Sequence, residues 1–152
     1  MIKIKDIIYT LEQFAPLVLQ EKYDNCGLIT GNNNEDCTKA LLTIDTTEEI
    51  VDEAIKIGAN LIISHHPIVF SGLKSITGKN YVERTIIKAI KNDIAIYAAH
   101  TNFDSVLSGV NSKIAEKLGL NSCRVLVPQL NLLKKLVTFI PLEYAEQVSQ
   151  AL

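Results

Sequence analysis

The sequence predicts an α/β fold: a three-layer domain built on a parallel sheet, with helices on both faces. Short, continuous apolar segments, which are typical of strands buried on both faces, alternate with amphipathic segments at helical spacing. Polar residues follow these apolar segments, as expected where parallel strands end beside a ligand site. A content of 47% hydrophobic and 21% charged residues in 152 positions is typical of a folded globular protein with a real core.

The predicted elements alternate along the chain. We expect helices at 6–14, from Thr46 to Ile57, at 81–91 and at 110–118, and strands at 40–44, 61–63 and 94–98. The Gly-, Asn- and Asp-rich stretch 23–34 is predicted to be turn and loop, and a long loop runs from Ile68 to about Lys79. Because successive parallel strands join through right-handed crossovers, the helices cover both faces of the sheet.

The second helix has start and stop signals. Thr46 with Glu49 three residues later forms a capping-box pattern, which predicts the helix N-terminus. Gly58 follows the last apolar position of the helix and is predicted to end it in a left-handed conformation.

The last stretch predicts the start of a second unit. Residues 135–140 are expected to form a strand that Pro141 interrupts, and residues 142–152 an amphipathic helix. One strand and one helix cannot bury their own apolar faces, so we expect this to be the front part of a longer protein. The domain boundaries are accordingly predicted as 1–130 and 131–152.

Composition argues against several partners. A formal net charge of −2 without a basic stripe argues against nucleic-acid binding. No apolar run approaches the roughly 20 residues that span a bilayer, and the N-terminus lacks a signal-peptide pattern, so no membrane is expected and the cytoplasm is the predicted location. Three widely separated cysteines without a C-x-x-C spacing are predicted to be free thiols.

Sequence-distant polar residues end three predicted strands: Asp45, the pair His65 and His66, and His100 followed by Asp104. Imidazole and carboxylate groups are ligands of Zn, Mn, Fe, Co and Ni. Adjacent side chains of an extended chain point to opposite sides, so His65 and His66 suit two divalent ions, and Asp104 could bridge them. His100 is expected to orient ligands or move a proton in catalysis.

Less specific explanations exist for each residue. A histidine at a strand end is often structural, with its ring hydrogen-bonded to a backbone carbonyl. Asp45 more often caps a helix or satisfies a neighbour than binds metal. Asp24 and Asn25 more often build a turn.

The segment Gly72–Lys79 resembles a phosphate-binding loop without matching it. It has one residue too many between its glycines, and Asn80 stands where Ser or Thr should follow the lysine. We therefore reject it as a P-loop. Lys74 and Lys79 could still attract an anionic ligand, but a solvated loop is the better explanation for them.

Four segments resemble motifs of one known family, the Nif-three-like dinuclear metal proteins, also called GTP cyclohydrolase I type 2 homologues. The matching segments are Asp24-Asn25-Cys26-Gly27-Leu28, Leu42-Thr43-Ile44-Asp45-Thr46-Thr47, Asn60-Leu61-Ile62-Ile63-Ser64-His65-His66-Pro67, and Ile94 to Asp104 with the H-T-N-x-D pattern, followed by Gly109-Val110-Asn111. The resemblance extends from about Ile4 to Leu120.

The resemblance implies a function. It assigns His65, His66 and Asp104 as ligands of two divalent metal ions, in a metal-dependent hydrolase with an unsettled small-molecule substrate; the alternative is a non-catalytic metal-binding assembly or regulatory protein. The family's remaining ligands, a His and a Glu, come from a C-terminal half, and this sequence has no histidine after His100. We therefore expect the 152-residue chain alone to bind metal weakly or incompletely. The resemblance also implies that residues 135–152 begin a ferredoxin-like inserted domain, and that the full-length protein forms a homohexamer.

Overall fold

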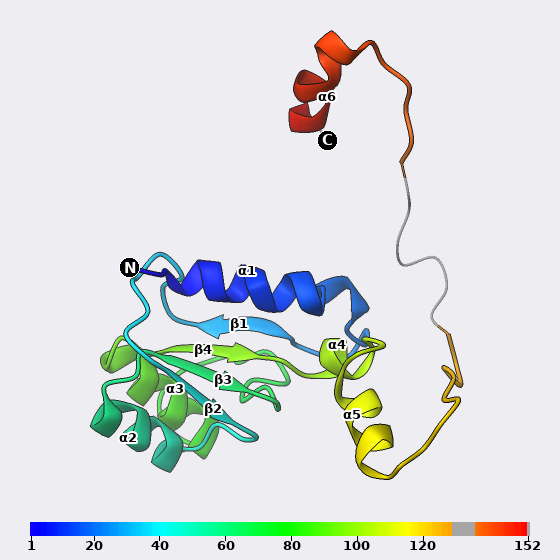
Figure 1. The fold of residues 1–152 in the computed structure, drawn as a ribbon. Coiled ribbons are helices and arrows are strands. Elements are labelled where there is room, and N and C mark those ends of the chain that lie inside the picture. The colour runs from blue at the N-terminus through cyan, green and yellow to red at the C-terminus, as the bar shows by residue number, and fades with distance from the viewer. Residues whose placement is uncertain (129–135, 152) are drawn as a thin grey trace.

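A four-stranded mixed sheet forms the centre of the computed structural model, which describes residues 1–128 and 136–151 (Figure 1). The strands are β1 (Gly27–Thr30), β2 (Ala40–Thr43), β3 (Leu61–Ser64) and β4 (Ala95–Ala98). The helices are α1 (Ile4–Phe14), α2 (Glu48–Ile57), α3 (Tyr81–Lys91), α4 (Thr101–Asp104), α5 (Val110–Lys117) and α6 (Ala145–Ala151), with short 3-10 helices η1 (Leu17–Leu19) and η2 (Leu142–Tyr144).

The strands lie in the order β1-β4-β3-β2, and β2, β3 and β4 are parallel, as predicted. The prediction of a loop across residues 23–34 is wrong at β1, which pairs antiparallel with β4 at the edge of the sheet. Turn-forming residues surround β1, and only its long-range pairing with β4 makes four residues a strand. Gly31 follows the last residue of β1 with φ +104°, and an added Cβ there would lie 2.4 Å from Cα of Ala95.

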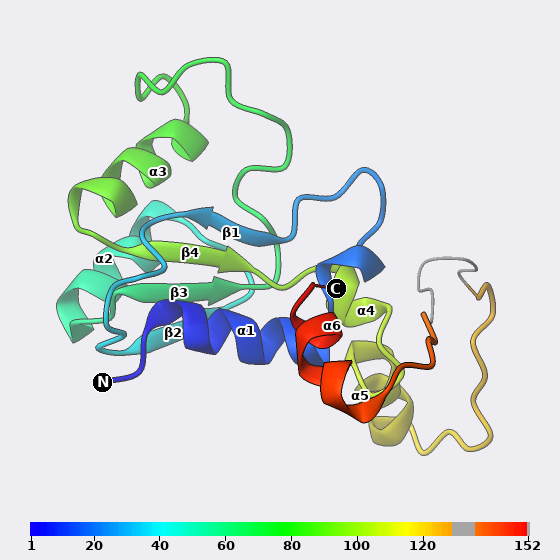
Figure 2. The same ribbon diagram turned by 90° about the horizontal axis from the view of Figure 1, so that it is seen from above.

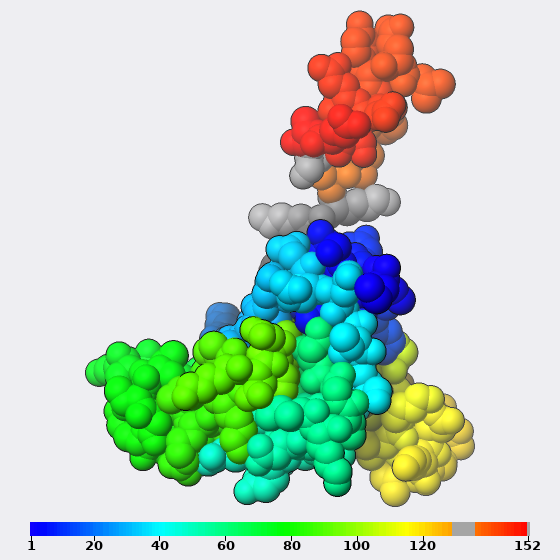
Figure 3. All heavy atoms as spheres, turned by 90° about the vertical axis from the view of Figure 1, so that its left-hand side faces the viewer, coloured from blue at the N-terminus to red at the C-terminus, as the bar shows by residue number. Residues whose placement is uncertain are grey.

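The sheet separates two apolar layers, which confirms the predicted three-layer architecture. Because successive strand residues point to opposite faces, each strand contributes to both layers. The layer under α1 contains Ile4, Ile8, Leu61, Ala95 and Tyr97, and the layer under α2 and α3 contains Val51, Ala54, Ile62, Ile86, Ala89 and Ile96. Figure 1 shows α1 on one side of the sheet and α2 and α3 on the other, and Figure 2 shows α1 running along the strands. In the space-filling view of Figure 3, the surfaces of α2 and α3 lie side by side.

The predicted limits of α2 are nearly confirmed. Its N-cap is Thr47 rather than Thr46, and the Thr47 hydroxyl accepts a hydrogen bond from the backbone N–H of Ile50 (3.3 Å). Thr46 is instead buried, because it faces the protein interior as the chain leaves β2. Gly58 adopts the left-handed conformation expected of a C-cap, with φ +70°.

The C-terminal stretch differs from the prediction. Residues 136–140 form no strand, and residue 135 lies outside the described residues. A strand needs a hydrogen-bonded neighbour, and no described segment pairs with this one. The predicted helix at 142–152 is confirmed as η2 followed by α6, up to Ala151. Among the described residues, no helix has the length and apolar character required to cross a membrane.

Candidate metal centre

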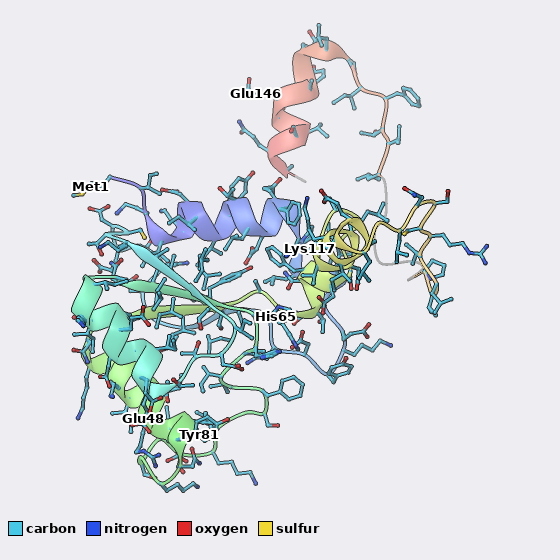
Figure 4. All side chains as sticks on the ribbon, turned by 60° about the horizontal axis from the view of Figure 1, so that its bottom comes forward. Met1, Glu48, His65, Tyr81, Lys117 and Glu146 are labelled. Carbon is cyan, nitrogen blue, oxygen red and sulfur yellow. The ribbon has the colours of Figure 1, made fainter. Side chains whose placement is uncertain are left out.

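Three histidines from two strand ends meet at one edge of the sheet. One ring nitrogen from each of His65, His66 and His100 lies within 4.8 Å of those of the other two. The ring centroids are 4.9 Å apart for His65 and His66, 5.1 Å for His65 and His100, and 5.5 Å for His66 and His100. In Figure 4, His65 lies between Lys117 of α5 and the starts of α2 and α3, marked by Glu48 and Tyr81.

Backbone hydrogen bonds continue beyond the strands and hold this edge in place. The N–H groups of His65 and His66 donate to the carbonyls of Thr43 (3.1 Å) and Ile44 (2.9 Å), and Ala99 N–H donates to Ser64 (2.8 Å). β3 ends at Ser64, so the alternation of an extended chain no longer applies to the next two residues. The expectation that their rings point to opposite sides is therefore not met, since both rings contact the His100 ring.

Each of the three rings has its Nδ1 atom held by an oxygen acceptor. His65 Nδ1 donates to the Ala99 carbonyl (2.9 Å). His66 Nδ1 lies 2.8 Å from Oδ1 of Asp45, and His100 Nδ1 lies 2.9 Å from Oδ1 of Asp24. A proton on Nδ1 leaves the Nε2 lone pair free, and metal-binding histidines are oriented by the same kind of hydrogen bond. The cluster thus fits a divalent cation of the Zn, Mn, Fe, Co or Ni type.

Asp24 is the buried acceptor in this arrangement. Burial opposes ionisation, but hydrogen bonds from Cys26, Thr101 and His100 outweigh it and hold the pKa of Asp24 well below its ordinary value. The hydroxyl and the N–H of Thr101 both donate to Oδ2 of Asp24. Local sequence patterns indicate only a turn at Asp24, and the one signal that points further is its place in the D-N-x-G-L motif.

Asp45 satisfies a neighbour, as one of the sequence-based alternatives expected, and that neighbour is His66. Asp104 ends the short helix α4 and is half-buried. Its carboxylate is not among the groups that converge with the three imidazoles in the described part of the chain. The assignment of Asp104 as a metal ligand stays a prediction. His100, which was expected only to support the site, has a ring nitrogen within 4.8 Å of those of His65 and His66.

The loop that resembles a phosphate-binding loop is occupied by a side chain of the protein itself. Oε2 of the buried Glu83 accepts hydrogen bonds from the backbone N–H groups of Thr77 (2.9 Å) and Lys79 (3.2 Å). The hydrogen bond from the Thr77 backbone, against the opposing effect of burial, lowers the pKa of Glu83 to about 2. These N–H groups are not free to cradle a phosphate, which agrees with the rejection of the P-loop.

The sequence matches the family described as Duf34/NIF3 (NGG1p interacting factor 3) over residues 2–152. A Clostridium perfringens protein named GTP cyclohydrolase 1 type 2 homolog is 47% identical over 119 residues, which are 78% of this chain and 45% of that protein. A Bacillus subtilis protein of the same name is 43% identical over 149 residues, 97% of this chain and 40% of that protein. The chain therefore spans less than half the length of these relatives.

Solved structures agree with this similarity. A Bacillus cereus protein related to NIF3 superposes with a TM-score of 0.79 at 40% identity, covering 99% of this chain and 42% of that one. Reduced HcgD from Methanocaldococcus jannaschii gives a TM-score of 0.74 at 32% identity, covering 80% of this chain and 48% of that one.

Proposed function

Because this chain belongs to the Duf34/NIF3 family, we propose that it binds divalent metal ions at the edge of the sheet where β3 and β4 end, and takes part in metal-dependent hydrolysis. One observation carries the proposal. All three imidazoles of the cluster have Nδ1 held by an oxygen acceptor, and their ligand atoms converge within 4.8 Å. Histidines that only stabilise a fold have no need for Nδ1 to be held in all three rings, with Nε2 of each left free.

In this proposal His65 and His66 hold the metal. Asp104, from the short helix that follows β4, is the proposed carboxylate bridge between two ions. A pair of divalent ions, when bound, supplies Lewis acidity that polarises a substrate oxygen and makes water easier to deprotonate. The three imidazoles converge in the structure, and imidazoles together with a carboxylate are the donor chemistry that such ions select.

His100 and Asp24 form the proposed proton-transfer pair. The buried carboxylate fixes the His100 tautomer with hydrogen on Nδ1, so Nε2 accepts a proton from water or substrate. The same carboxylate stabilises the imidazolium that results, because its low pKa keeps it ionised. Thr101 also restrains Asp24 through its hydroxyl, so the pair keeps one geometry.

The names of the relatives guide the choice of substrate class. We propose a nucleotide, or another phosphorylated or cyclic amide compound, as the molecule that is hydrolysed. The name GTP cyclohydrolase 1 type 2 homolog, which the relatives carry, supports this choice.

The test measures metal content and turnover together. The protein is titrated with Zn²⁺, Mn²⁺, Fe²⁺, Co²⁺ and Ni²⁺, and product release is followed with GTP and with p-nitrophenyl phosphoesters. We expect His65→Ala and His66→Ala to lose metal and turnover, whereas Lys56→Ala, on the exposed side of α2, keeps both. Stoichiometric metal without turnover of any of these compounds would instead identify a non-catalytic metal-binding protein, and unchanged metal content in both histidine variants would contradict the site.

A further inference from the structure

Two exposed aromatic rings stand beside the histidine cluster. The rings of Tyr23 and Phe70 have centroids 6.2 Å apart at an interplanar angle of 44°. Phe70 also approaches His100 edge to face, at 6.5 Å and 81°. Tyr23 is 65% exposed and Phe70 49% exposed, so much of each ring surface faces solvent at the border of the proposed metal site.

Hydrogen bonds link the two loops that carry these rings. Nδ2 of Asn25 donates to the carbonyl of Val69 (2.6 Å), next to Phe70 in the chain. The backbone N–H of Asn25 donates to Oδ1 of Asp24 (2.7 Å), the carboxylate that holds His100. The position of the aromatic pair relative to the imidazoles is therefore set by the same residues that orient His100.

Neither ring belongs to an apolar layer of the fold. Both layers consist of other side chains, and neither Tyr23 nor Phe70 is among the buried or partly buried members of either layer. Isolated exposed apolar residues are common on protein surfaces, but these two form a pair from separate loops, held in place beside polar, ligand-capable groups. Aromatic faces in such a position gain most from a flat ring, through offset or edge-to-face stacking.

We propose that Tyr23 and Phe70 form an aromatic wall that selects substrates carrying a planar aromatic or heteroaromatic ring, and orients the ring so that its polar substituent meets the histidines. The inference rests on the proposed function for the role of the substituent, which the metal site would bind. It narrows the proposed substrate class to compounds with a planar ring and names the residues that set this specificity. A saturated ring of equal size offers no flat face and contacts the wall less well.

The experiment compares phenylphosphonate with cyclohexylphosphonate, at a pH high enough that both are dianions; they have the same number of carbons and a C–P bond that resists hydrolysis. NMR titrations give both dissociation constants, in the presence of Zn²⁺ and after its removal. We expect the phenyl compound to bind about 3- to 10-fold more tightly, the range given by one aromatic contact. Phe70→Leu and Tyr23→Leu should each bring the ratio of the two dissociation constants toward one, and Phe70→Tyr should retain the ratio of the unsubstituted protein.

Two matched controls use aromatic residues of similar exposure elsewhere. Tyr9→Leu, at 65% exposure on α1, and Phe14→Leu, at 45% exposure and paired with Phe103, should leave the ratio unchanged. An unfolding midpoint for each variant verifies the fold. A wild-type ratio of one, or an unchanged ratio in both wall variants, overturns the aromatic wall. Failure to bind Zn²⁺ would defeat the proposed function, while the ratio in the metal-free protein still decides the wall.

Discussion

The carboxylate of Asp24 and the imidazole of His100, 76 positions apart in the sequence, are in direct contact, with Nδ1 lying 2.9 Å from Oδ1 and 3.0 Å from Oδ2. The Asp24 side chain is fully buried, whereas the His100 side chain is 18% exposed. One partner is therefore shielded from water, and the other reaches the surface where a substrate can approach.

Asp24→Asn should reduce turnover about 10- to 100-fold, because the His100 imidazolium loses the buried charge that stabilises it. Metal affinity should change little, since His65 and His66 are the proposed ligands. Asp45→Asn is the matched comparison, because Asp45 holds His66 but its side chain is 65% exposed and water can replace it. Initial rates measure turnover, and competition titration with a chromogenic chelator measures metal affinity; an equal loss of turnover in the two variants would show that burial of the acceptor is irrelevant.

Asp104→Asn should lower the metal content of the loaded protein, because a neutral amide does not offset the repulsion between adjacent cations. Elemental analysis after dialysis gives the ratio of metal to protein. Asp93→Asn, at an exposed turn after α3, serves as the control. A metal content equal to that of the unsubstituted protein would remove Asp104 from the proposed bridge.

Glu83→Gln should destabilise the protein near neutral pH, with an effect that fades in acid. The pKa of Glu83 is lowered from 4.5 to about 2 in the folded protein, so folding favours the ionised form. Its stabilisation is fully present above about pH 4.5 and is lost as the pH falls toward 2. Urea denaturation at pH 7, 5, 4 and 3 gives the free energy of unfolding of the unsubstituted protein and of Glu83→Gln. The two values should converge as the pH falls, whereas a constant difference would contradict a lowered pKa of Glu83.

The Glu83 measurement has a surface control. Glu116→Gln removes an exposed carboxylate paired with Lys113, and water solvates both partners. Its effect on the free energy of unfolding should lie within about 0.5 kcal/mol at every pH.

Gly31→Ala should destabilise the fold by about 2 kcal/mol or more. The residue combines φ +104° with a position where Cβ would meet the backbone of Ala95 at 2.4 Å, so strain and a clash add. Gly72→Ala is the control, since an added Cβ meets nothing within 4 Å and φ is not positive. Equal denaturation midpoints for the two variants would refute the argument.

Sequence patterns predict the features that are set locally or by simple topology. Apolar runs predict β2, β3 and β4, and the rule that parallel strand ends share an edge is enough to bring His65, His66 and His100 together. β1 escapes such a prediction because a four-residue strand among turn formers exists only through its pairing with β4. The role of Asp24 escapes it too, because its partner lies 76 residues away and no local spacing reveals such a contact.

The N-cap of α2 is a second case in which a local sequence pattern does not decide the outcome. Thr46 and Thr47 are chemically identical candidates for the N-cap of α2, and the choice between them depends on which one the interior accommodates.

The prediction of a strand at 135–140 is wrong over residues 136–140, which have no pairing partner among the described strands.

The hydrogen bond from His65 to the carbonyl of Ala99 differs from the other two in one respect. Its acceptor is main chain, so a substitution at position 99 abolishes it only by moving the backbone. Single substitutions at Asp45 and Asp24 can change the hydrogen bond to Nδ1 of His66 and of His100, but no side-chain substitution replaces the acceptor of His65. Mutation can thus change the basicity of the His66 and His100 rings one at a time, while the tautomer of His65 stays the same.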